Sequence, residues 1–361
     1  MAEILGTLML NRLRGAEDLL SEPAVEAEVD GYRAERVLDE YVWEDLLARH
    51  PLRSAYTSWG WGEYKRGSGW NVERFRVVDA AGVTRALYQT QTQKRCGIRR
   101  VLIQGGPLFF DCETYSKISK IVEVMLKQID VRWNVVIGIN FYGFRTDETV
   151  MGILASGFAP ILNRRNFTLV MDLSKGLDDV RAQLNQTARR YVKLGLKNPK
   201  LSCDIVRGAR ERRAAIDRLA AMYDDLATRK NFEKGFNTSA FRKIVGDDDR
   251  YVIAEAHVDG EVASLYIAHQ AAKRMIGLVA ASNELARANE ASYLAIWTLF
   301  EYACSEGLTS FDLSGIDPFG NYGTFQFKRR ISRKLEQSDP LWLYCKNPVL
   351  RNAVTLALTR S

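Results

Sequence analysis

Two halves of the chain repeat the same order of predicted elements, and this repeat limits the possible folds more than any other feature. In the first half, three strand patterns precede a helix and a further strand, over residues 73–78, 84–94, 100–104, 116–128 and 133–140. The second half has the same order over residues 251–258, 261–269, 274–281, 292–306 and 310–313. Strands joined by short turns pair antiparallel, whereas a helical connection favours parallel neighbours. The repeat therefore predicts a duplicated α/β (α+β) unit, each copy a mixed, largely antiparallel sheet flanked by helices.

The length of 361 residues is compatible with two domains. We expect a first domain over residues 36–170 and a second over residues 171–335. Residues 1–35 are expected to form a helix or a loosely packed arm. The tail over residues 336–361 is expected to pack on the first domain.

Composition restricts the partners and the setting of the protein. The formal charge of +7 permits a polyanionic partner without requiring one. No apolar run has the length of a membrane span, so no transmembrane segment is predicted. Five cysteines lack any CxxC pairing and three histidines lie far apart, which predicts reduced thiols, a cytoplasmic protein and no metal site.

A stretch rich in glycine, aromatic and basic residues follows the strand at 310–314. It runs from Gly315 to Ser332 and contains Phe327 and Lys328. Glycine allows backbone to approach a ligand, and the cations can lie beside an anion. The alternative is a turn followed by a basic strand exposed to solvent.

The most basic stretch covers residues 181–197 and contains no acid. We expect it to belong to one helix over residues 177–196. On that helix Arg189 and Lys193 share a face, and like charges at this spacing are destabilising. An anionic ligand would offset that cost, while a solvated basic face is the alternative.

Two further stretches combine aromatic residues, glycines and charges. If residues 56–65 are helical, Lys65 lies one turn after Trp61 and the stretch can form the wall of a groove. The alternative is the edge of a packed helix with a snorkelling lysine. Farther along, Gly105 and Gly106 precede a proline, and Asp111 lies just beyond.

The order and spacing of four stretches resemble the FemAB (FemABX) transferases. These belong to the broader GNAT-like fold, which includes BioF2-like acetyltransferases. The resemblance covers roughly residues 36–350. The stretches are Trp61-Gly62-Glu63-Tyr64-Lys65, Gln104-Gly105-Gly106-Pro107 followed by an Asp, Arg189 with Lys193, and Asp312 to Gly315 followed by Phe327-Lys328.

The resemblance implies two tandem GNAT-like domains with a cleft between them. It also implies transfer of an aminoacyl group from aminoacyl-tRNA to an amine, forming an amide bond. The acceptor would be a small molecule or peptide, such as a peptidoglycan precursor or a natural-product intermediate. Aminoacyl-tRNA would serve as co-substrate without a further cofactor, and a monomer is expected.

The same resemblance assigns roles to individual residues. Lys65 matches the family's phosphate-contacting lysine. Arg189 matches the arginine of its basic helix, with Arg190 as an alternative register. The remaining substrate-binding candidates are Trp61, Gly106, Lys193 and Tyr322.

The catalytic candidates are Lys328, Phe327 and Asp111. Three residues separate Pro107 from Asp111, where the family pattern has two. We expect Lys328 to stabilise negative charge in the tetrahedral intermediate or on the leaving ribose. The general base is open between Asp111, Asp317 and the substrate itself.

Acyl-CoA is the rival donor. GNAT enzymes bind pyrophosphate at a glycine-rich loop that begins a helix. The corresponding segment here, residues 285–291, has no glycine, and Glu290 would repel phosphate. The sequence therefore favours aminoacyl-tRNA over acyl-CoA. A basic RNA-binding protein without catalytic activity is a third alternative.

Overall fold

The computed structural model describes residues 27–142, 146–162, 166–230 and 237–360. They form two compact units: a first unit of residues 27–162 with 339–360, and a second unit of residues 166–338. Most of the arm predicted over residues 1–35 lies outside the described residues. Its described end is a hairpin of β1 (Glu28–Val29) and β2 (Tyr32–Arg36).

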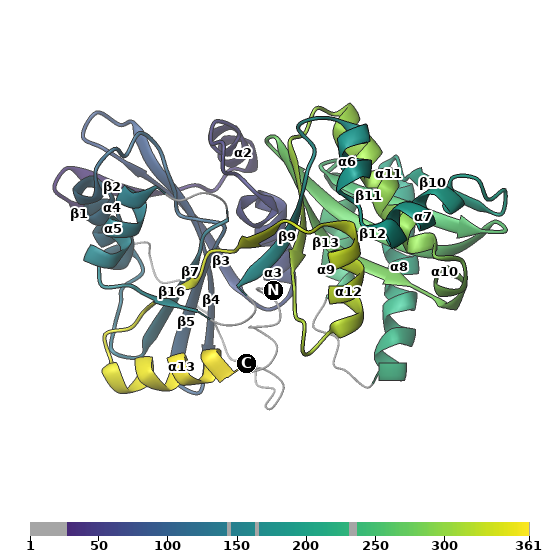
Figure 1. The fold of residues 1–361 in the computed structure, drawn as a ribbon. Coiled ribbons are helices and arrows are strands. Elements are labelled where there is room, and N and C mark those ends of the chain that lie inside the picture. Colours follow the sequence, from purple (N-terminus) through teal and green to yellow (C-terminus); the bar gives the residue numbers. More distant parts are fainter. Residues whose placement is uncertain (1–26, 143–145, 163–165, 231–236, 361) are drawn as a thin grey trace. The chain divides into compact units, whose positions relative to one another are not determined.

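The first unit is built on one mixed sheet (Figure 1). Its other strands are β3 (Asn71–Val78), β4 (Thr84–Arg95), β5 (Ile98–Gln104), β6 (Leu108–Phe109), β7 (Val135–Asn140), β8 (Ala159–Ile161) and β16 (Leu341–Tyr344). Their order is β1-β2-β3-β4-β5-β7-β16-β8, and β6 pairs with β4. Pairing is antiparallel except between β5 and β7. The C-terminal strand β16 thus completes a sheet that begins near the other end of the chain.

Helices cover both faces of this sheet. They are α2 (Glu40–Ala48), the 3-10 helix η1 (Ala55–Thr57), α3 (Trp59–Gly67), α4 (Tyr115–Gln128), α5 (Asp147–Ala155) and α13 (Pro348–Arg360). The apolar stripe of α4 packs with α5 on one face, where Ile118, Ile121 and Ile153 are buried. On the other face, α2 and α13 pack in two smaller clusters. The α4 crossover allows β5 and β7 to run parallel.

The second unit is also built on one mixed sheet. Its strands are β9 (Phe167–Asp172), β10 (Leu201–Ile205), β11 (Tyr251–Val258), β12 (Glu261–Ala271), β13 (Arg274–Ser282), β14 (Ser310–Gly315) and β15 (Leu335–Gln337). Their order is β10-β11-β12-β13-β14-β9-β15. Only β13 and β14 pair parallel among these strands of the described chain.

The helices of the second unit cover both faces of its sheet, and the side chains of β11 point to these faces in turn. They are α6 (Leu177–Gln183), α7 (Gln186–Gly195), α8 (Ala209–Lys230), α9 (Thr238–Asp247), α10 (Glu284–Asn289), α11 (Ala291–Ser305) and α12 (Tyr322–Ile331). Val252 and Ala254 share a core with α11, whose Trp297 is fully buried. The next residue of the strand after Ala254, Glu255, pairs instead with Arg218 of α8. Because strand side chains alternate, α11 and α8 cover opposite faces.

The two units share one topology, as the repeated element order predicts. In each, an antiparallel meander (β3-β4-β5 or β11-β12-β13) leads through a helical crossover into a parallel neighbour (β7 or β14). The strand beyond that neighbour comes from a distant part of the chain: β16 beside β7, and β9 beside β14. The predicted mixed, largely antiparallel sheets are thereby confirmed.

One local prediction and one alternative interpretation are wrong. The helix expected over residues 177–196 is divided into α6 and α7, because Leu184 is extended and the side chain of Asn185 caps α7 at the Ala188 amide (2.7 Å). The basic run after Gly315 forms α12, whereas the alternative interpretation made it a strand. Asn321 caps α12, and its inward residue Ile331 is fully buried.

The packing of α5 on α4 yields a stability prediction. A Cβ added at Gly152 would lie 2.5 Å from Cγ2 and 2.7 Å from Cβ of Ile118. Branched Ile118 is fully buried and cannot move aside, so Gly152→Ala should lower the free energy of unfolding by about 1–3 kcal/mol. Gly195→Ala, whose Cβ would meet nothing nearer than 3.6 Å, is the control for chemical denaturation. Equal stabilities of the two variants would contradict this packing.

Candidate functional site

The residues predicted to act on substrate are divided between the two units. Lys328, Phe327, Tyr322, Arg189 and Lys193 belong to the second unit. Lys65, Trp61, Gly106 and Asp111 belong to the first.

Lys328 lies on α12 with its amine directed at the end of β14. Its Nζ donates to the carbonyl oxygens of Ser314 (3.2 Å) and Gly315 (2.8 Å). Burial lowers the pKa of Lys328 to about 8, and the negative charge of Asp312 partly opposes this shift. An amine with such a pKa changes charge near neutral pH, which is uncommon for lysine.

Asp312 shapes the turn that presents those two carbonyls. Its Oδ1 accepts a hydrogen bond from the Ser314 amide (2.7 Å) and another from Oγ1 of Thr168 on β9. Ser314 has a φ of 66°, and the β14–β9 register shifts between Asp312 and Gly315. The carboxylate thus stabilises a left-handed residue that is not glycine, and the irregular turn directs successive carbonyls toward Lys328.

The turn lies where the parallel pairing of β13 and β14 ends. The paired residues end at Ile276 and Asp312, although β13 continues to Ser282. Gly277 follows directly, and a Cβ there would lie 2.6 Å from the hydroxyl of Tyr266. Burial and the Asp312 charge raise the pKa of Tyr266, so its hydroxyl stays neutral at ordinary pH. Lys328, Asp312 and Tyr266 together form a largely buried polar group in the second unit.

Aromatic contacts join α12 to the basic helix α7. The ring of Phe327 lies 4.9 Å from that of Tyr293, which lies 5.1 Å from that of Tyr191 on α7. Arg330 donates to the Tyr293 hydroxyl (3.3 Å), and the guanidinium of Arg190 lies 5.1 Å from the Tyr191 ring. The buried ring of Tyr293 and the half-buried rings of Phe327 and Tyr191 thus connect cations of both helices.

Arg189 differs from its neighbour on α7. Its Nη2 donates to the carbonyls of Ala182 and Leu184, each at 3.0 Å, at the junction of α6 and α7. Arg189 therefore helps hold the helix junction, while Arg190 contacts the aromatic surface. Lys193 is exposed one turn farther along α7.

In the first unit, Lys65 is surrounded by aromatic rings. Lys65 is only 5% exposed. Its Nζ lies 5.3 Å from the ring centroid of Trp61, 5.7 Å from that of Tyr64 and 5.8 Å from that of Trp70. Cation–π attraction stabilises a charge in this position. The structure brings Lys65 and Trp61 together on α3, as the predicted one-turn spacing requires.

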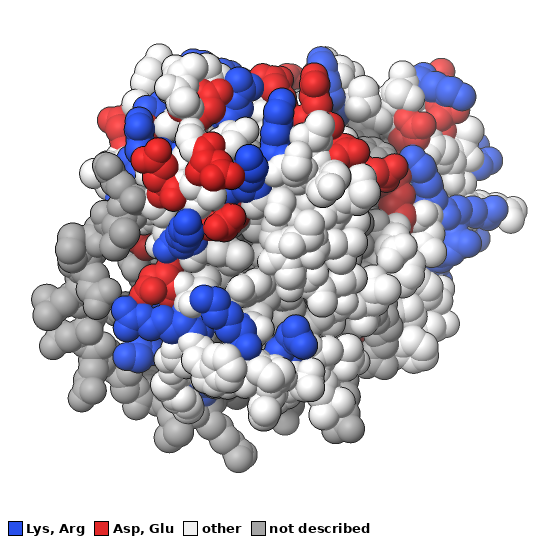
Figure 2. Space-filling view, turned by 90° about the vertical axis from the view of Figure 1, so that its left-hand side faces the viewer, with Lys and Arg blue, Asp and Glu red and all other residues white. Residues whose placement is uncertain are grey.

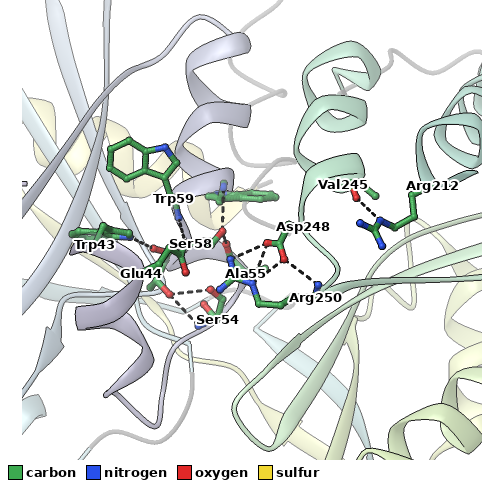
Figure 3. A network of polar contacts seen from close by, with 12 residues as sticks. Trp43, Glu44, Ser54, Ala55, Ser58, Trp59, Arg212, Val245, Asp248 and Arg250 are labelled. Atoms are coloured by element: carbon green, nitrogen blue, oxygen red, sulfur yellow. Dashed lines mark hydrogen bonds and ion pairs between the residues drawn. The ribbon is translucent and has the colours of Figure 1, made fainter. Parts of the chain in front are cut away.

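The start of α3 is fixed by polar contacts that Figure 3 shows at close range. Ser58 accepts a hydrogen bond from the Trp61 amide (3.1 Å), and Glu44 accepts one from the Trp59 amide (2.7 Å). The Trp43 indole donates to the Thr57 carbonyl (2.9 Å). A buried indole and two side-chain oxygens thereby set the orientation of the helix that carries Lys65.

The glycine pair after β5 lies against the same region. Trp61 donates through Nε1 to Gln104 (3.1 Å), the residue before the pair. Gly105 has a φ of 75°, and a Cβ there would lie 2.9 Å from both Ser54 Oγ and Thr57 Cγ2. Glycine is therefore required at Gly105 for close approach to η1. Gly106 is buried and joined to Pro107 by a cis peptide bond.

Asp111 does not join the aromatic group around Lys65. Its side chain is 84% exposed and lies 3.5 Å from Arg85. Asp111 follows β6, which pairs with β4 at Ala86 and Leu87, near one end of β4. Trp70, whose ring lies beside Lys65, precedes the β3 residue that pairs with Thr92, near the other end of β4. At about 3.3 Å per strand residue, the two ends lie on the order of 20 Å apart.

The structure adds site residues that sequence reasoning missed. Asp312 occurred only as part of a motif, and Thr168 and Tyr266 were not considered. Thr168 is separated from Asp312 by 144 positions in the sequence, so no local pattern links them. The Asp-x-Ser-Gly order after a strand was the available signal, because aspartate commonly bonds a backbone amide two residues on.

The segment considered for phosphate binding forms a short helix. Residues 284–289 are α10, and Glu290, at a φ of 56°, directly precedes α11. The Tyr293 amide bonds to the Glu290 carbonyl (3.0 Å). An acidic residue therefore directly precedes the first turn of α11, where the positive end of the helix dipole lies.

Comparisons with known proteins agree with this fold. The family described as an acetyltransferase (GNAT) domain matches residues 178–329, within the second unit. A crystal structure of FemX has a TM-score of 0.73 at 15% identity, covering 89% of this chain and 100% of that chain. The protein has a FemAB-like tandem GNAT fold.

Two other solved structures share this fold. L-PGS from Bacillus licheniformis has a TM-score of 0.57 at 16% identity, covering 94% of this chain and 100% of that chain. A tandem GNAT protein from the clavulanic acid biosynthesis pathway has a TM-score of 0.51 at 11% identity, covering 87% and 98%. The search of curated proteins returned no match.

The family match over residues 178–329 supports an acyltransferase. Among the described residues, no helix has the length and apolar character needed to cross a membrane. The same residues contain no group of three or more His, Cys, Asp or Glu that could hold a metal ion.

Proposed function

We propose that the protein transfers an aminoacyl group from aminoacyl-tRNA to the amine of a small molecule or peptide. The observation that carries the proposal is the Lys328 amine, held by two backbone carbonyls within a GNAT-like unit. A peptidoglycan precursor or a natural-product intermediate is a suitable acceptor.

The reaction needs alignment and charge stabilisation more than a strong nucleophile. The neutral acceptor nitrogen attacks the ester carbonyl of the donor, and its electrons form the new C–N bond. The C–O bond to the ribose then breaks, and the proton lost by nitrogen goes to the ribose oxygen. Negative charge develops on the carbonyl oxygen and the leaving oxygen along this path.

Lys328 is suited to stabilise that charge. In its protonated form it carries three N–H groups, and the carbonyls of Ser314 and Gly315 accept two of them. The third remains for the developing oxyanion. Two fixed bonds hold the ammonium in one orientation, so little reorganisation is needed during the reaction.

The first unit supports binding of an acceptor that carries phosphate. Lys65 lies on α3 and is surrounded by aromatic rings, including those of Trp61 and Trp70. It resembles the phosphate-contacting lysine of FemAB-like transferases. Trp61, Gly106 and the exposed Asp111 remain candidates for the acceptor side. Asp111, at the other end of β4, would contact a different part of the acceptor from Lys65.

The choice of donor is supported by the start of α11. Phosphate binding at a helix N-terminus uses free amides and the positive end of the helix dipole. Here Glu290 places a carboxylate at that end, and α10 replaces a glycine-rich loop. Both features disfavour the pyrophosphate of acyl-CoA.

Transfer assays test the donor directly. Purified protein is incubated with candidate precursor amines and either aminoacyl-tRNA or acetyl-CoA, each labelled in the acyl group. We expect labelled amide from aminoacyl-tRNA, and at most traces from acetyl-CoA. Heat-inactivated protein controls for spontaneous aminolysis of the ester. Label transferred from acetyl-CoA alone would refute the proposed donor.

A further inference from the structure

Three loops meet at one edge of the sheet in the first unit. The turn between β4 and β5 is bonded to the loop before β7, because the side chain of Asn134 donates to the Gly97 carbonyl (2.6 Å). The third loop follows β16, which runs antiparallel to β7 and last pairs Tyr344 with Ile137, near the start of β7. The chain therefore leaves β16 at the edge where the other two loops lie. We call these loops the hairpin edge, which comprises residues 94–99, 130–134 and 345–351.

Positive charge collects along the hairpin edge. Residues 94–100 contain four cations and no acid, and residues 345–361 contain three cations and no acid. In the remaining loop, Asp130 pairs with Arg132 at 2.7 Å. In Figure 2, which views the molecule from the side of the first unit, basic side chains gather low on that side, whereas both signs are interspersed higher up. Three cations of the edge are exposed and form no ion pair with a described residue: Lys94, Lys346 and Arg351.

Exposed apolar side chains lie among these cations. The indole of Trp133, in the loop before β7, is 64% exposed. Val349, in the first turn of α13, is 77% exposed, and Leu356, two turns farther along the same side of that helix, is 51% exposed. Another side of α13 packs on the sheet through Leu350 and Val354. An indole and aliphatic groups beside cations are the combination typical of proteins that bind at a membrane–water interface.

We propose that the hairpin edge docks the protein on an anionic phospholipid bilayer. The Trp133 indole and the Val349 side chain enter the headgroup region, and the lysines of the edge contact lipid phosphates. Anionic headgroups complement the charge of the edge, and the attraction falls off within a Debye length of the surface. In this arrangement α13 lies on the bilayer and does not cross it. The inference goes beyond the proposed transfer reaction and does not depend on it.

Other occupants fit these observations less well. RNA phosphates would use the cations, but aliphatic side chains such as Val349 give a base no ring on which to stack. A second copy of this chain would bring two basic edges together, and like charges repel. An anionic bilayer matches both the charge and the exposed apolar groups.

Vesicle sedimentation with the full chain tests the cations. The vesicles contain phosphatidylglycerol and phosphatidylcholine in equal parts, or phosphatidylcholine alone. We expect binding to the anionic vesicles only, with affinity that falls as salt is added. Lys94→Gln/Lys346→Gln should bind about 10- to 30-fold more weakly, because each cation near an anionic surface contributes roughly fivefold. Lys117→Gln/Lys120→Gln, two exposed lysines near the start of α4, is the matched control and should bind almost as wild type.

Trp133 provides a spectroscopic test of the apolar contact. The structure describes all seven tryptophans, and the six others are buried or half-buried. Lipids brominated in their acyl chains should therefore quench part of the wild-type emission. Trp133→Phe should remove this quenching and keep most of the binding, whereas Trp133→Ala should bind about tenfold more weakly because it loses apolar contact. Tyr115→Ala, at the start of α4 and 49% exposed in the wild type, is the control.

Several outcomes would overturn the proposal. One is a wild-type protein that binds neither kind of vesicle at low salt, or binds both equally. Another is equal binding by the two lysine double variants, or binding without quenching of Trp133, because the contact would then lie elsewhere. Capture of a stem-loop RNA through the same lysines without vesicle binding would assign the edge to nucleic acid instead. A dimer that Trp133→Ala abolishes would assign it to a second copy.

The vesicle assay contains neither donor nor acceptor, so its result is independent of acyl transfer. A protein that binds anionic vesicles through the hairpin edge but transfers nothing would contradict only the proposed function. A protein that transfers the aminoacyl group but ignores the vesicles would contradict only this inference.

Discussion

Lys328→Met is expected to lower the rate of acyl transfer by about 10²- to 10³-fold, because it removes the ammonium that the structure directs at the turn after β14. Methionine has nearly the same length and shape, so the packing of α12 should change little. The loss should appear mainly in kcat, since the charge interacts most strongly with the developing oxyanion. Steady-state transfer kinetics with saturating donor provide the measurement.

A surface lysine supplies the control for this substitution. Lys120→Met changes the same chemical group on α4 of the first unit, where the amine pairs with Asp30 at 3.1 Å. It should keep the wild-type rate. Circular dichroism must show that Lys328→Met is folded. A folded variant with the wild-type rate would exclude Lys328 from the reaction.

The second large effect is a pH dependence caused by the same amine. The pKa of Lys328 is lowered to about 8, so a catalyst that needs the ammonium loses it above that pH. Transfer should therefore fall by on the order of tenfold for each further pH unit. If the neutral amine were the active form as a general base, transfer would instead rise up to pH 8. The pH–rate profile distinguishes these cases by its sign.

Stability provides a substrate-free test of the same pKa. The folded protein holds Lys328 at a pKa of about 8, below the ordinary value of 10.5. Between these values the unfolded chain binds more protons, so stability should rise with pH by up to roughly 3 kcal/mol from this group. Lys328→Met should lose that rise, measured as the difference between the two unfolding curves across pH. Parallel curves would contradict the lowered pKa.

Asp312 determines where the transition in rate should fall. Its charge raises the pKa of Lys328, while its Oδ1 organises the turn at Ser314. Asp312→Asn keeps an oxygen for the Ser314 amide and removes the charge. The alkaline fall in transfer should therefore move to lower pH in this variant, which a purely structural role of Asp312 would not produce.

Local sequence patterns predicted most of the elements that carry the site. The apolar run of β11 and the amphipathic pattern of α4 were sufficient, because the strand is buried on both faces and the helix buries one. Residues 59–67 form α3, so Lys65 lies one turn after Trp61, as expected if this stretch is helical. Predictions failed where a single capping residue decided the outcome, as at Asn185 between α6 and α7. A capping residue can interrupt a helical pattern that continues on both sides of it. Composition alone does not show whether one continuous helix or two capped helices form.

The repeated order of strands and helices by itself determined that this protein has two related mixed sheets, because side-chain periodicity and turn chemistry are local properties. The basic and aromatic stretches, with the family resemblance, also made Lys65 and Lys328 candidates without a structure. Only the tertiary structure decided their chemistry: rings from α3 and Trp70 surround Lys65, while the β14 turn, fixed by Thr168 from a distant strand, receives Lys328. The reason is that burial, charge and hydrogen-bond partners depend on chain segments brought together by folding, and a local pattern contains no information about them.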